Sequence, residues 1–241
     1  MLDLKDQRLL VIAPHPDDEI FGCGGLIYRI KQAGGEVFVL YLTVGTTKDY
    51  SKNGVSTSDE RIEEIKRVAK FMGFDGWRIA LPGNDYHLQL DHVPQKILAN
   101  EIERGEVERG STISLQAVKP TILAIPSYFD YNQDHRAANK AATTATRPVP
   151  PKYKHLPNTI IEYEFPYSEW SDVERPSPNL FIDLDKKALK AKLDALKLYK
   201  SQLKVQNGPL SLYGVETLAR MRGLHSGNSA AEAFVIRRHF V

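Results

Sequence analysis

The chain has 241 residues, of which 42% are hydrophobic and 26% are charged, a composition typical of a globular protein with a buried core. Its 32 basic and 30 acidic side chains nearly cancel, which argues against nucleic acid or an anionic membrane as the main partner and favours a small ligand. The single cysteine, Cys23, excludes an intrachain disulfide and is compatible with a reducing compartment. No apolar stretch is long enough to span a membrane and the first residues lack a signal-peptide pattern, so we expect a cytoplasmic protein.

Apolar runs alternate with amphipathic segments along the chain, the pattern of βαβ units around a mostly parallel sheet. The apolar runs lack polar alternation, as expected of strands covered on both faces. The first two thirds predict, in chain order, strand 8–13, helix 19–35, strand 36–44, helix 56–74, strand 77–81, loop 81–90, helix 95–110, strand 119–127 and helix 133–147. The remainder predicts strands 159–165 and 180–184, helix 185–203 and strand 231–238.

Two of the predicted strands lead directly into polar clusters. The strand over residues 8–13 leads into residues 15–19, and the strand over residues 119–127 leads into residues 132–135. In open α/β sheets, ligands bind beyond the carboxyl ends of the strands, near the point where the strand order reverses. We therefore expect both clusters to lie on the same edge of the sheet and to form one site.

The residue types in these clusters indicate a metal centre. His15 and Asp18 are three residues apart, so that one turn of backbone can direct both side chains to one point, and His135 adds a second imidazole. Two imidazoles and one carboxylate match a catalytic zinc site, which keeps a fourth position open for water. Asp17 adjoins Asp18, so one of the two carboxylates can bind metal while the other acts as a base; spacing alone leaves their roles open.

Each cluster also has an ordinary structural interpretation. Acidic residues are common at helix N-termini, where the helix dipole stabilises them. The charge here begins before the helix, beside His15 and Pro16, which favours a cation site. The glycines of GCGG do not have the G-x-G-x-x-G spacing of a dinucleotide site, and Cys23 is best interpreted as a small packing residue.

Several segments together resemble one known family. APHPDDE and NQDHRAANKAA resemble the two signatures of the LmbE-like, or PIG-L, family of zinc-dependent N-deacetylases, and the likeness continues in ERIEEIKRVAKFMG, ERPSPNLFIDL and LARMRGLHSGNSAAEAF. The resemblance implies an α/β fold, a Rossmann-like three-layer sandwich with a mostly parallel central sheet. It also implies a single domain over residues 1–241.

The resemblance assigns roles within the predicted metal centre. By motif, His15, Asp18 and His135 correspond to the zinc ligands and Asp17 to the general base. Asp134, within the second signature, is counted with the catalytic residues.

Other positions concern the substrate and the leaving group. Arg61 and Asp85 resemble residues that bind sugar hydroxyls in relatives, although a solvated helix charge and a turn aspartate explain them equally well. Asn132 stands where many relatives carry a histidine; an asparagine donates a hydrogen bond to an oxyanion but does not exchange a proton near neutral pH. The acid that protonates the leaving amine is then protonated Asp17 or another residue, for which His225 is a candidate; His225 is also counted with the substrate-binding residues.

The resemblance implies a zinc-dependent hydrolase that removes the N-acetyl group from an N-acetylglucosamine-type derivative, with Fe²⁺ or Co²⁺ as alternative metals. Its partner is then a small amino-sugar conjugate, without nucleic acid or stable membrane insertion, and a homo-oligomer stays open. Two alternatives are a zinc hydrolase of an ester or phosphoester and a non-catalytic Rossmann-like binding module; an intact Asp17 argues against the latter. Four aromatic residues are candidate walls for the apolar face of a sugar: Tyr128, Phe129, Tyr131 and Trp170.

Overall fold

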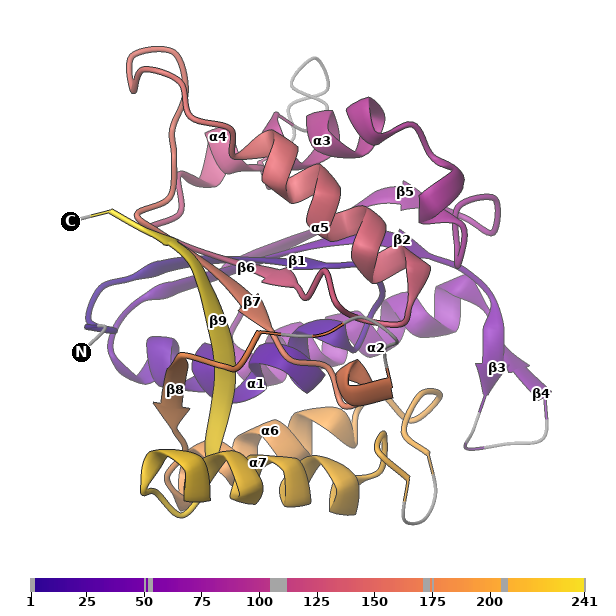
Figure 1. Ribbon diagram of the computed structural model, residues 1–241. Coiled ribbons are helices and arrows are strands. Elements are labelled where there is room, and N and C mark those ends of the chain that lie inside the picture. The colour runs from indigo at the N-terminus through magenta and orange to yellow at the C-terminus, as the bar shows by residue number, and fades with distance from the viewer. Residues whose placement is uncertain are drawn as a thin grey trace.

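The computed structural model describes residues 3–49, 51, 54–104, 112–170, 174, 176–204 and 208–240, and contains a seven-stranded sheet between two layers of helices (Figure 1). The strand order is β5-β2-β1-β6-β7-β9-β8, and β9 runs opposite to the other strands of this sheet. In chain order the strands of this sheet are β1 (Arg8–Ala13), β2 (Glu36–Val44), β5 (Gly76–Pro82), β6 (Ile122–Pro126), β7 (Thr159–Tyr163), β8 (Leu180–Asp183) and β9 (Ala231–His239). The predicted α/β class with a mostly parallel central sheet is confirmed.

Helices cover both faces of the sheet, as expected from its unbroken apolar strands. One face packs against α1 (Asp18–Gln32), α2 (Ser58–Met72), α6 (Lys186–Leu196) and α7 (Leu212–Ser226). The other packs against α3 (Gln95–Glu103), α4 (Leu115–Val118) and α5 (Gln133–Ala145). Along β1, Leu9 and Val11 enter the first core and Leu10 and Ile12 the second, so neither face of the strand has room for a polar side chain.

Three predicted helices differ from those observed. The helix predicted from residue 56 begins at Ser58, because Ser56 pairs within a small hairpin of β3 (Thr47–Asp49) and β4 (Gly54–Ser56), while Thr57 and Glu60 form a capping box. The helix predicted to residue 203 ends at Leu196, and beyond it Glu64 accepts the backbone N–H of Ser201 at 2.9 Å. The helix predicted over 95–110 is observed to Glu103, and residues 105–110 lie outside the described part of the chain.

Helix α7 was not predicted from the sequence. Its apolar side chains do not form one stripe: Val215 and Ala219 are buried, whereas Tyr213 and Leu224 are 67% and 80% exposed. Tertiary packing therefore outweighs the weak helical periodicity of this segment. Among the described residues, no helix is both long and apolar enough to cross a membrane.

The order of the strands places a reversal at β1. The chain passes from β1 to β2 and β5 on one side, and later returns to β6 on the other side of β1. The connections α1 and α5 consequently lie on opposite faces of the sheet. The connections that leave the carboxyl ends of β1 and β6 therefore diverge, and at such a point a ligand can approach the sheet.

Candidate metal centre

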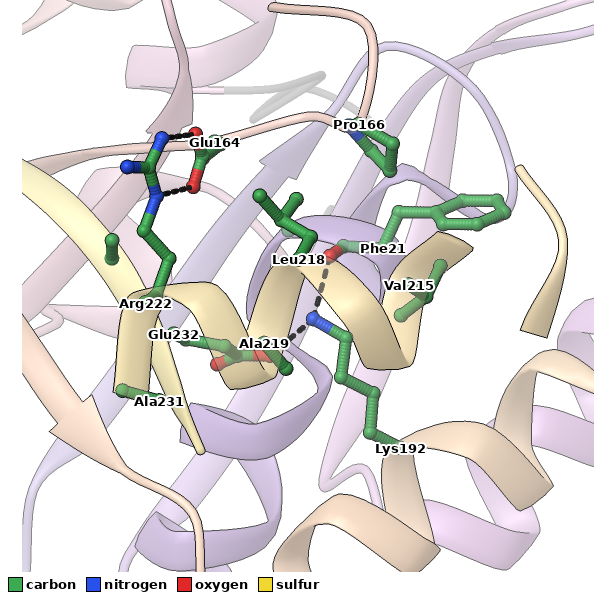
Figure 2. Close-up of a pocket in the computed structure, with 12 residues that line it drawn as sticks. Phe21, Glu164, Pro166, Lys192, Val215, Leu218, Ala219, Arg222, Ala231 and Glu232 are labelled. Carbon is green, nitrogen blue, oxygen red and sulfur yellow. Dashed lines mark hydrogen bonds and ion pairs between the residues drawn. The ribbon is translucent and has the colours of Figure 1, made fainter. Parts of the chain in front are cut away.

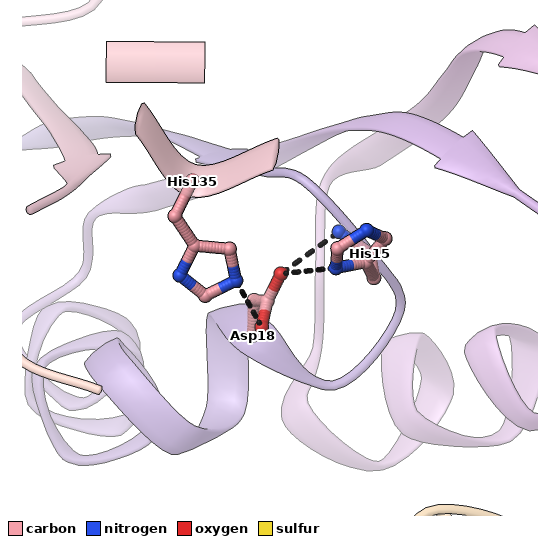
Figure 3. A group of neighbouring side chains, drawn as sticks. All are labelled: His15, Asp18 and His135. Carbon is pink, nitrogen blue, oxygen red and sulfur yellow. Dashed lines mark hydrogen bonds and ion pairs between the residues drawn. The ribbon is translucent and has the colours of Figure 1, made fainter. Parts of the chain in front are cut away.

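The two polar clusters predicted from the sequence meet at this reversal. His15 lies in the turn after β1, Asp18 begins α1, and His135 lies in the first turn of α5, which follows β6. Their candidate ligand atoms all lie within 4.8 Å of one another, and all three side chains are buried (Figure 3). The chain thus brings two imidazoles and one carboxylate to one point from segments more than a hundred residues apart.

Each histidine has a carboxylate on one side of its ring and Asp18 on the other. His15 Nε2 lies 2.8 Å from Asp134 Oδ2, and His15 Nδ1 lies 3.4 Å from Asp18 Oδ2. His135 Nδ1 lies 3.2 Å from Asp130 Oδ2, and His135 Nε2 lies 3.3 Å from Asp18 Oδ1. Carboxylates that contact the outer nitrogen of a histidine fix its tautomer and direct the other nitrogen toward a metal.

The donor set fits a divalent metal ion. The His135 contacts are close enough for ion pairs but poorly aligned, and neither ring nitrogen has a hydrogen-bonding partner within the described part of the chain. Buried polar atoms without such partners are rare in proteins. A cation between the three residues would satisfy Nε2, whereas Nδ1 faces Asp130. The residues available to hold it are His15 through Nδ1, His135 through Nε2, and Asp18.

The charges of the cluster shift the pKa values of its members. Burial alone would lower the pKa values of both histidines, but the adjacent carboxylates outweigh it and raise them, that of His135 by more. Burial opposes ionisation of Asp18, yet contacts with His135 and His15 hold its pKa well below the usual range. A metal ion between the three residues would balance the same carboxylates and would compete with protons for the ring nitrogens.

Asp17 differs from its neighbour in both backbone and environment. Its φ of 106° lies in the left-handed region, which non-glycine residues rarely adopt, and such strain often occurs at functional sites. Arg61 supports the turn, because its Nη2 donates to the carbonyl of Pro16 at 3.2 Å. The Asp17 carboxylate makes no hydrogen bond with any described residue, and burial together with the charge of Asp18 raises its pKa well above the usual value.

The other predicted residues occupy varied positions. Asn132 caps α5: its Oδ1 accepts the Asp134 N–H at 2.9 Å, which leaves its Nδ2 without a described partner. Arg61 is only 1% exposed and lies beneath the turn of the motif, so in this conformation it does not face solvent. Asp85 is exposed in the loop after β5. His225 is exposed at the end of α7, where its Nδ1 lies 3.2 Å from Arg222 Nη1; its contacts do not reach the cluster.

One buried histidine near the cluster was missed by the sequence analysis. His87, 8% exposed, lies in the loop after β5, and its ring centroid is 5.4 Å from that of His15. Its Nε2 lies 3.3 Å from Arg61 Nη1; because a guanidinium only donates, Nε2 must accept and the ring proton must reside on Nδ1. Burial, with smaller effects of His15 and Arg61, lowers the pKa of His87 to about 3. The sequence signal that could have identified His87 is its position shortly after β5, whose carboxyl end lies on the same edge of the sheet.

Aromatic rings extend outward from His135. Phe165 lies against His135 at 5.0 Å between centroids, Tyr167 lies 6.4 Å from Phe165, and Tyr131 lies 5.7 Å from Tyr167. Of the four predicted wall residues, Tyr131 belongs to this group, Tyr128 and Phe129 pair with each other at 5.5 Å, and Trp170 is 80% exposed. Phe165, Tyr167 and the outer carboxylate Asp130 were not predicted.

Comparison with known proteins gives one family match, one similar sequence and two similar structures. Residues 10–146 match the family model PIG-L, described as GlcNAc-PI de-N-acetylase. The chain is 27% identical over 239 residues to a diacetylchitobiose deacetylase of Thermococcus kodakarensis, covering 94% of this chain and 81% of that protein. The structure resembles the A40926 pseudoaglycone deacetylase Dbv21, with a TM-score of 0.70, 19% identity and coverage of 98% and 100%. It resembles equally the hydratase GalB of Pseudomonas putida, with a TM-score of 0.70, 20% identity and 97% coverage of each chain.

Proposed function

Because the chain belongs to the PIG-L family, we propose that it is a metal-dependent amidohydrolase that removes the N-acetyl group from an N-acetylglucosamine-type derivative. The observation that carries the proposal is the buried set of His15, Asp18 and His135 beside the strained Asp17. The products are acetate and a free amino sugar. We further propose zinc as the metal, a small amino-sugar conjugate as the partner, and the cytoplasm as the compartment, the last being compatible with the single Cys23.

The residues of the chain divide the work of such a hydrolysis. Bound zinc would supply Lewis acidity, which polarises an amide carbonyl and lowers the pKa of water from 15.7 to about 7. The Asp17 carboxylate takes a proton from the water that attacks the acetamide carbon. As the carbon–nitrogen bond breaks, protonated Asp17 returns that proton to the leaving nitrogen, so acetate and amine are formed from amide and water. Asn132 Nδ2 donates to the carbonyl oxygen as negative charge develops there.

The outer residues hold this arrangement. In this account Asp134 is a positioning residue, because its Oδ2 contacts His15 while its Oδ1 accepts the backbone N–H of Leu90 at 2.9 Å. Asp130 does the same for His135. Arg61, which is buried beneath this turn, fixes the backbone that presents Asp17.

The test is a substrate panel with purified, zinc-loaded protein. N-acetylglucosamine derivatives should release acetate and a primary amine detectable with an amine-reactive dye, and His135→Ala should abolish both metal binding and release. The GalB likeness shows that this fold also occurs in a hydratase, so acetate esters, phosphate esters and an unsaturated acid belong to the panel. Turnover of one of these without acetamide turnover would exclude the proposal.

A further inference from the structure

A buried ion pair contacts the helix that begins at the metal centre. Lys192 of α6 and Glu232 of β9 lie 2.7 Å apart, and their side chains are only 5% and 4% exposed. They line a small cavity of about 20 Å³ beneath α7, together with Phe21 of α1 (Figure 2). Both residues come from the part of the chain beyond the family match, which ends at residue 146.

The pair hydrogen-bonds to backbone groups of α1 that are four residues apart. Glu232 accepts the backbone N–H groups of Gly25 and Leu26, each at 2.7 Å, and Lys192 Nζ donates to the carbonyl of Phe21 at 2.7 Å. In a regular α-helix, the N–H of residue 25 would donate to the carbonyl of residue 21. Here Lys192 Nζ donates to the Phe21 carbonyl (Figure 2). Glu232 accepts the N–H of Gly25.

The GCGG segment makes room for this pair. A Cβ atom at Gly24 would lie 3.0 Å from Lys192 Cγ, and one at Gly25 would lie 3.0 Å from Glu232 Cδ and 2.3 Å from Leu184 Cδ2. Larger residues would therefore push the charged groups away from the helix backbone. This packing requirement explains Gly24 and Gly25, and the segment has neither the spacing nor the surroundings of a dinucleotide site.

The contacts continue to the metal-binding turn. The N–H of Phe21 donates to the carbonyl of Asp17 at 2.9 Å, so the backbone at Phe21 is tied to Asp17 on one side and to Lys192 on the other. The first turn of α1, which carries Asp18, lies between these two contacts. A hydrophobic pair of similar volume would serve stability as well as a buried ion pair. A directional charged pair does more, since it sets where the helix backbone lies.

We propose that Lys192 and Glu232 are positioning residues for the metal-binding turn, acting through the backbone of α1. The expected effect on zinc binding and catalysis rests on the proposed function, whereas the contact of the pair with the backbone of α1 does not. It extends the machinery of the site to the C-terminal third of the chain, more than 170 residues from Asp17 and Asp18.

The test compares Lys192→Met with a matched control, Lys154→Met. Lys154 also forms a buried ion pair, with Glu103 at 3.0 Å and exposures of 4% and 8%, but Glu103 ends α3 on the opposite face of the sheet. Both variants should lose stability. Only Lys192→Met should speed amide hydrogen exchange at residues 17–26 in the metal-free protein. It should also weaken the zinc affinity of the folded protein by about 10-fold, the lower end of the range for groups that orient metal ligands. The kcat should fall with little change in KM.

Glu232→Gln keeps the volume of the side chain and provides the second variant if Lys192→Met fails to fold. It should show the same faster exchange and weaker zinc binding in smaller measure. If, at matched stability, these variants show the same hydrogen exchange and zinc affinity as Lys154→Met, the pair has only a structural role, and the inference is wrong. If the wild-type protein itself binds no zinc, the proposed function fails, and exchange at residues 17–26 alone decides on the positioning role.

Discussion

Two neighbouring aspartates of the same motif have opposite electrostatic situations. Asp18 contacts both histidines, and these contacts keep it ionised despite burial. Asp17 has no hydrogen bond to its carboxylate from a described residue, and burial together with the charge of Asp18 raises its pKa, which makes it the stronger base of the two. Adjacent carboxylates in one turn can thus serve as a ligand and as a base, because the left-handed backbone at Asp17 gives each its own surroundings.

The first prediction separates these roles. Asp17→Asn should retain zinc but lose amide hydrolysis by about 10²-fold or more, the usual effect of removing a general base. Asp18→Asn should instead lose zinc, because it removes the carboxylate that contacts both histidines. Zinc content by atomic absorption and amine release would be measured on both variants. A metal-free Asp17→Asn beside a zinc-loaded, inactive Asp18→Asn would reverse the assignment.

The second prediction concerns Cys23. The thiol is fully buried in α1, and burial, reinforced by the carboxylates of Glu232 and Glu19, raises its pKa well above the usual value. Since only a thiolate is a good nucleophile, the native protein should not react with a disulfide reagent at neutral pH, whereas the denatured chain should release one equivalent. Rapid labelling of the folded protein would contradict this packing role.

Residues within contiguous motifs were predictable, whereas residues brought in by loops were not. The sequence placed His15, Asp18 and His135 at one sheet edge because each follows an apolar strand closely. His87 follows a strand as well, but its loop carries no spacing that distinguishes a buried imidazole from a surface one. Asp130 was missed because only the three-dimensional arrangement brings its carboxylate to His135.

At the scale of elements, the apolar strands formed where the sequence predicted them, whereas several helix ends and the weakly patterned helix α7 were not predicted. Strand β2 has the predicted bounds, because its uninterrupted apolar run fits the interior of a sheet. It pairs with β1 on one side and with β5 on the other. Helix α7 has apolar side chains on more than one face and lacks a single stripe. Its position depends on packing against α6 and β9, which local sequence does not encode.

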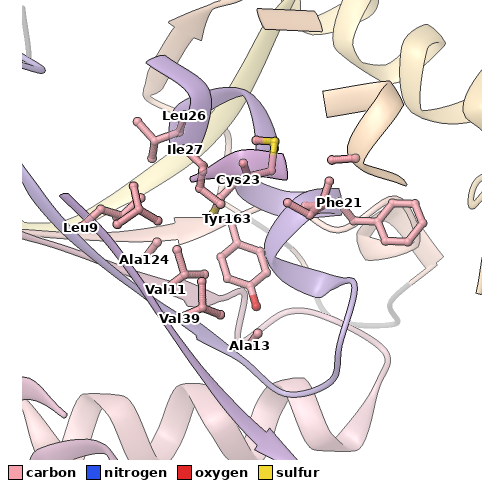
Figure 4. Packing of buried hydrophobic residues seen from close by; sticks show 14 of the residues in the cluster. Leu9, Val11, Ala13, Phe21, Cys23, Leu26, Ile27, Val39, Ala124 and Tyr163 are labelled. Atoms are coloured by element: carbon pink, nitrogen blue, oxygen red, sulfur yellow. The ribbon is translucent and has the colours of Figure 1, made fainter. Parts of the chain in front are cut away.

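The third prediction tests the packing between α1 and the sheet. The Tyr163 side chain lies between them (Figure 4). Its hydroxyl donates to the carbonyl of Ile12 at 3.0 Å. A Cβ atom at Gly22 would lie 2.3 Å from Tyr163 Cδ2, and the ring is anchored at its other end. Gly22→Ala should therefore destabilise the protein by about 1–3 kcal/mol, although alanine gains about 1 kcal/mol of helix propensity.

Urea denaturation of four proteins measures this effect: wild type, Gly22→Ala, Tyr163→Leu and the double variant. In the Tyr163→Leu background the added methyl group should cost less, so the two substitutions should be coupled. A Gly22→Ala protein more stable than the wild type would mean that the ring adjusts freely and that the glycine is not required for this contact.

At the scale of the whole molecule, the topology concentrates charge at one place. The reversal of strand order at β1 brings the clusters after β1 and β6 together, and burial of several carboxylates and imidazoles there is unfavourable without a balancing cation. A metal ion that binds the folded chain and not the unfolded one must then raise stability by mass action.

The last prediction follows from this linkage. At a free zinc concentration of about 100 times the dissociation constant, binding should add about 2.7 kcal/mol. For a protein of this size that gain corresponds to a rise in Tm of roughly 5–11 °C, reversible with a chelator. His135→Ala should show no such rise, because it lacks one of the three ligands. One calorimetric transition with and without zinc would agree with the predicted single domain. If zinc raised the Tm of His135→Ala as much as that of the wild type, the stabilising ion would bind elsewhere, and the centre built from His15, Asp18 and His135 would lose its thermodynamic support.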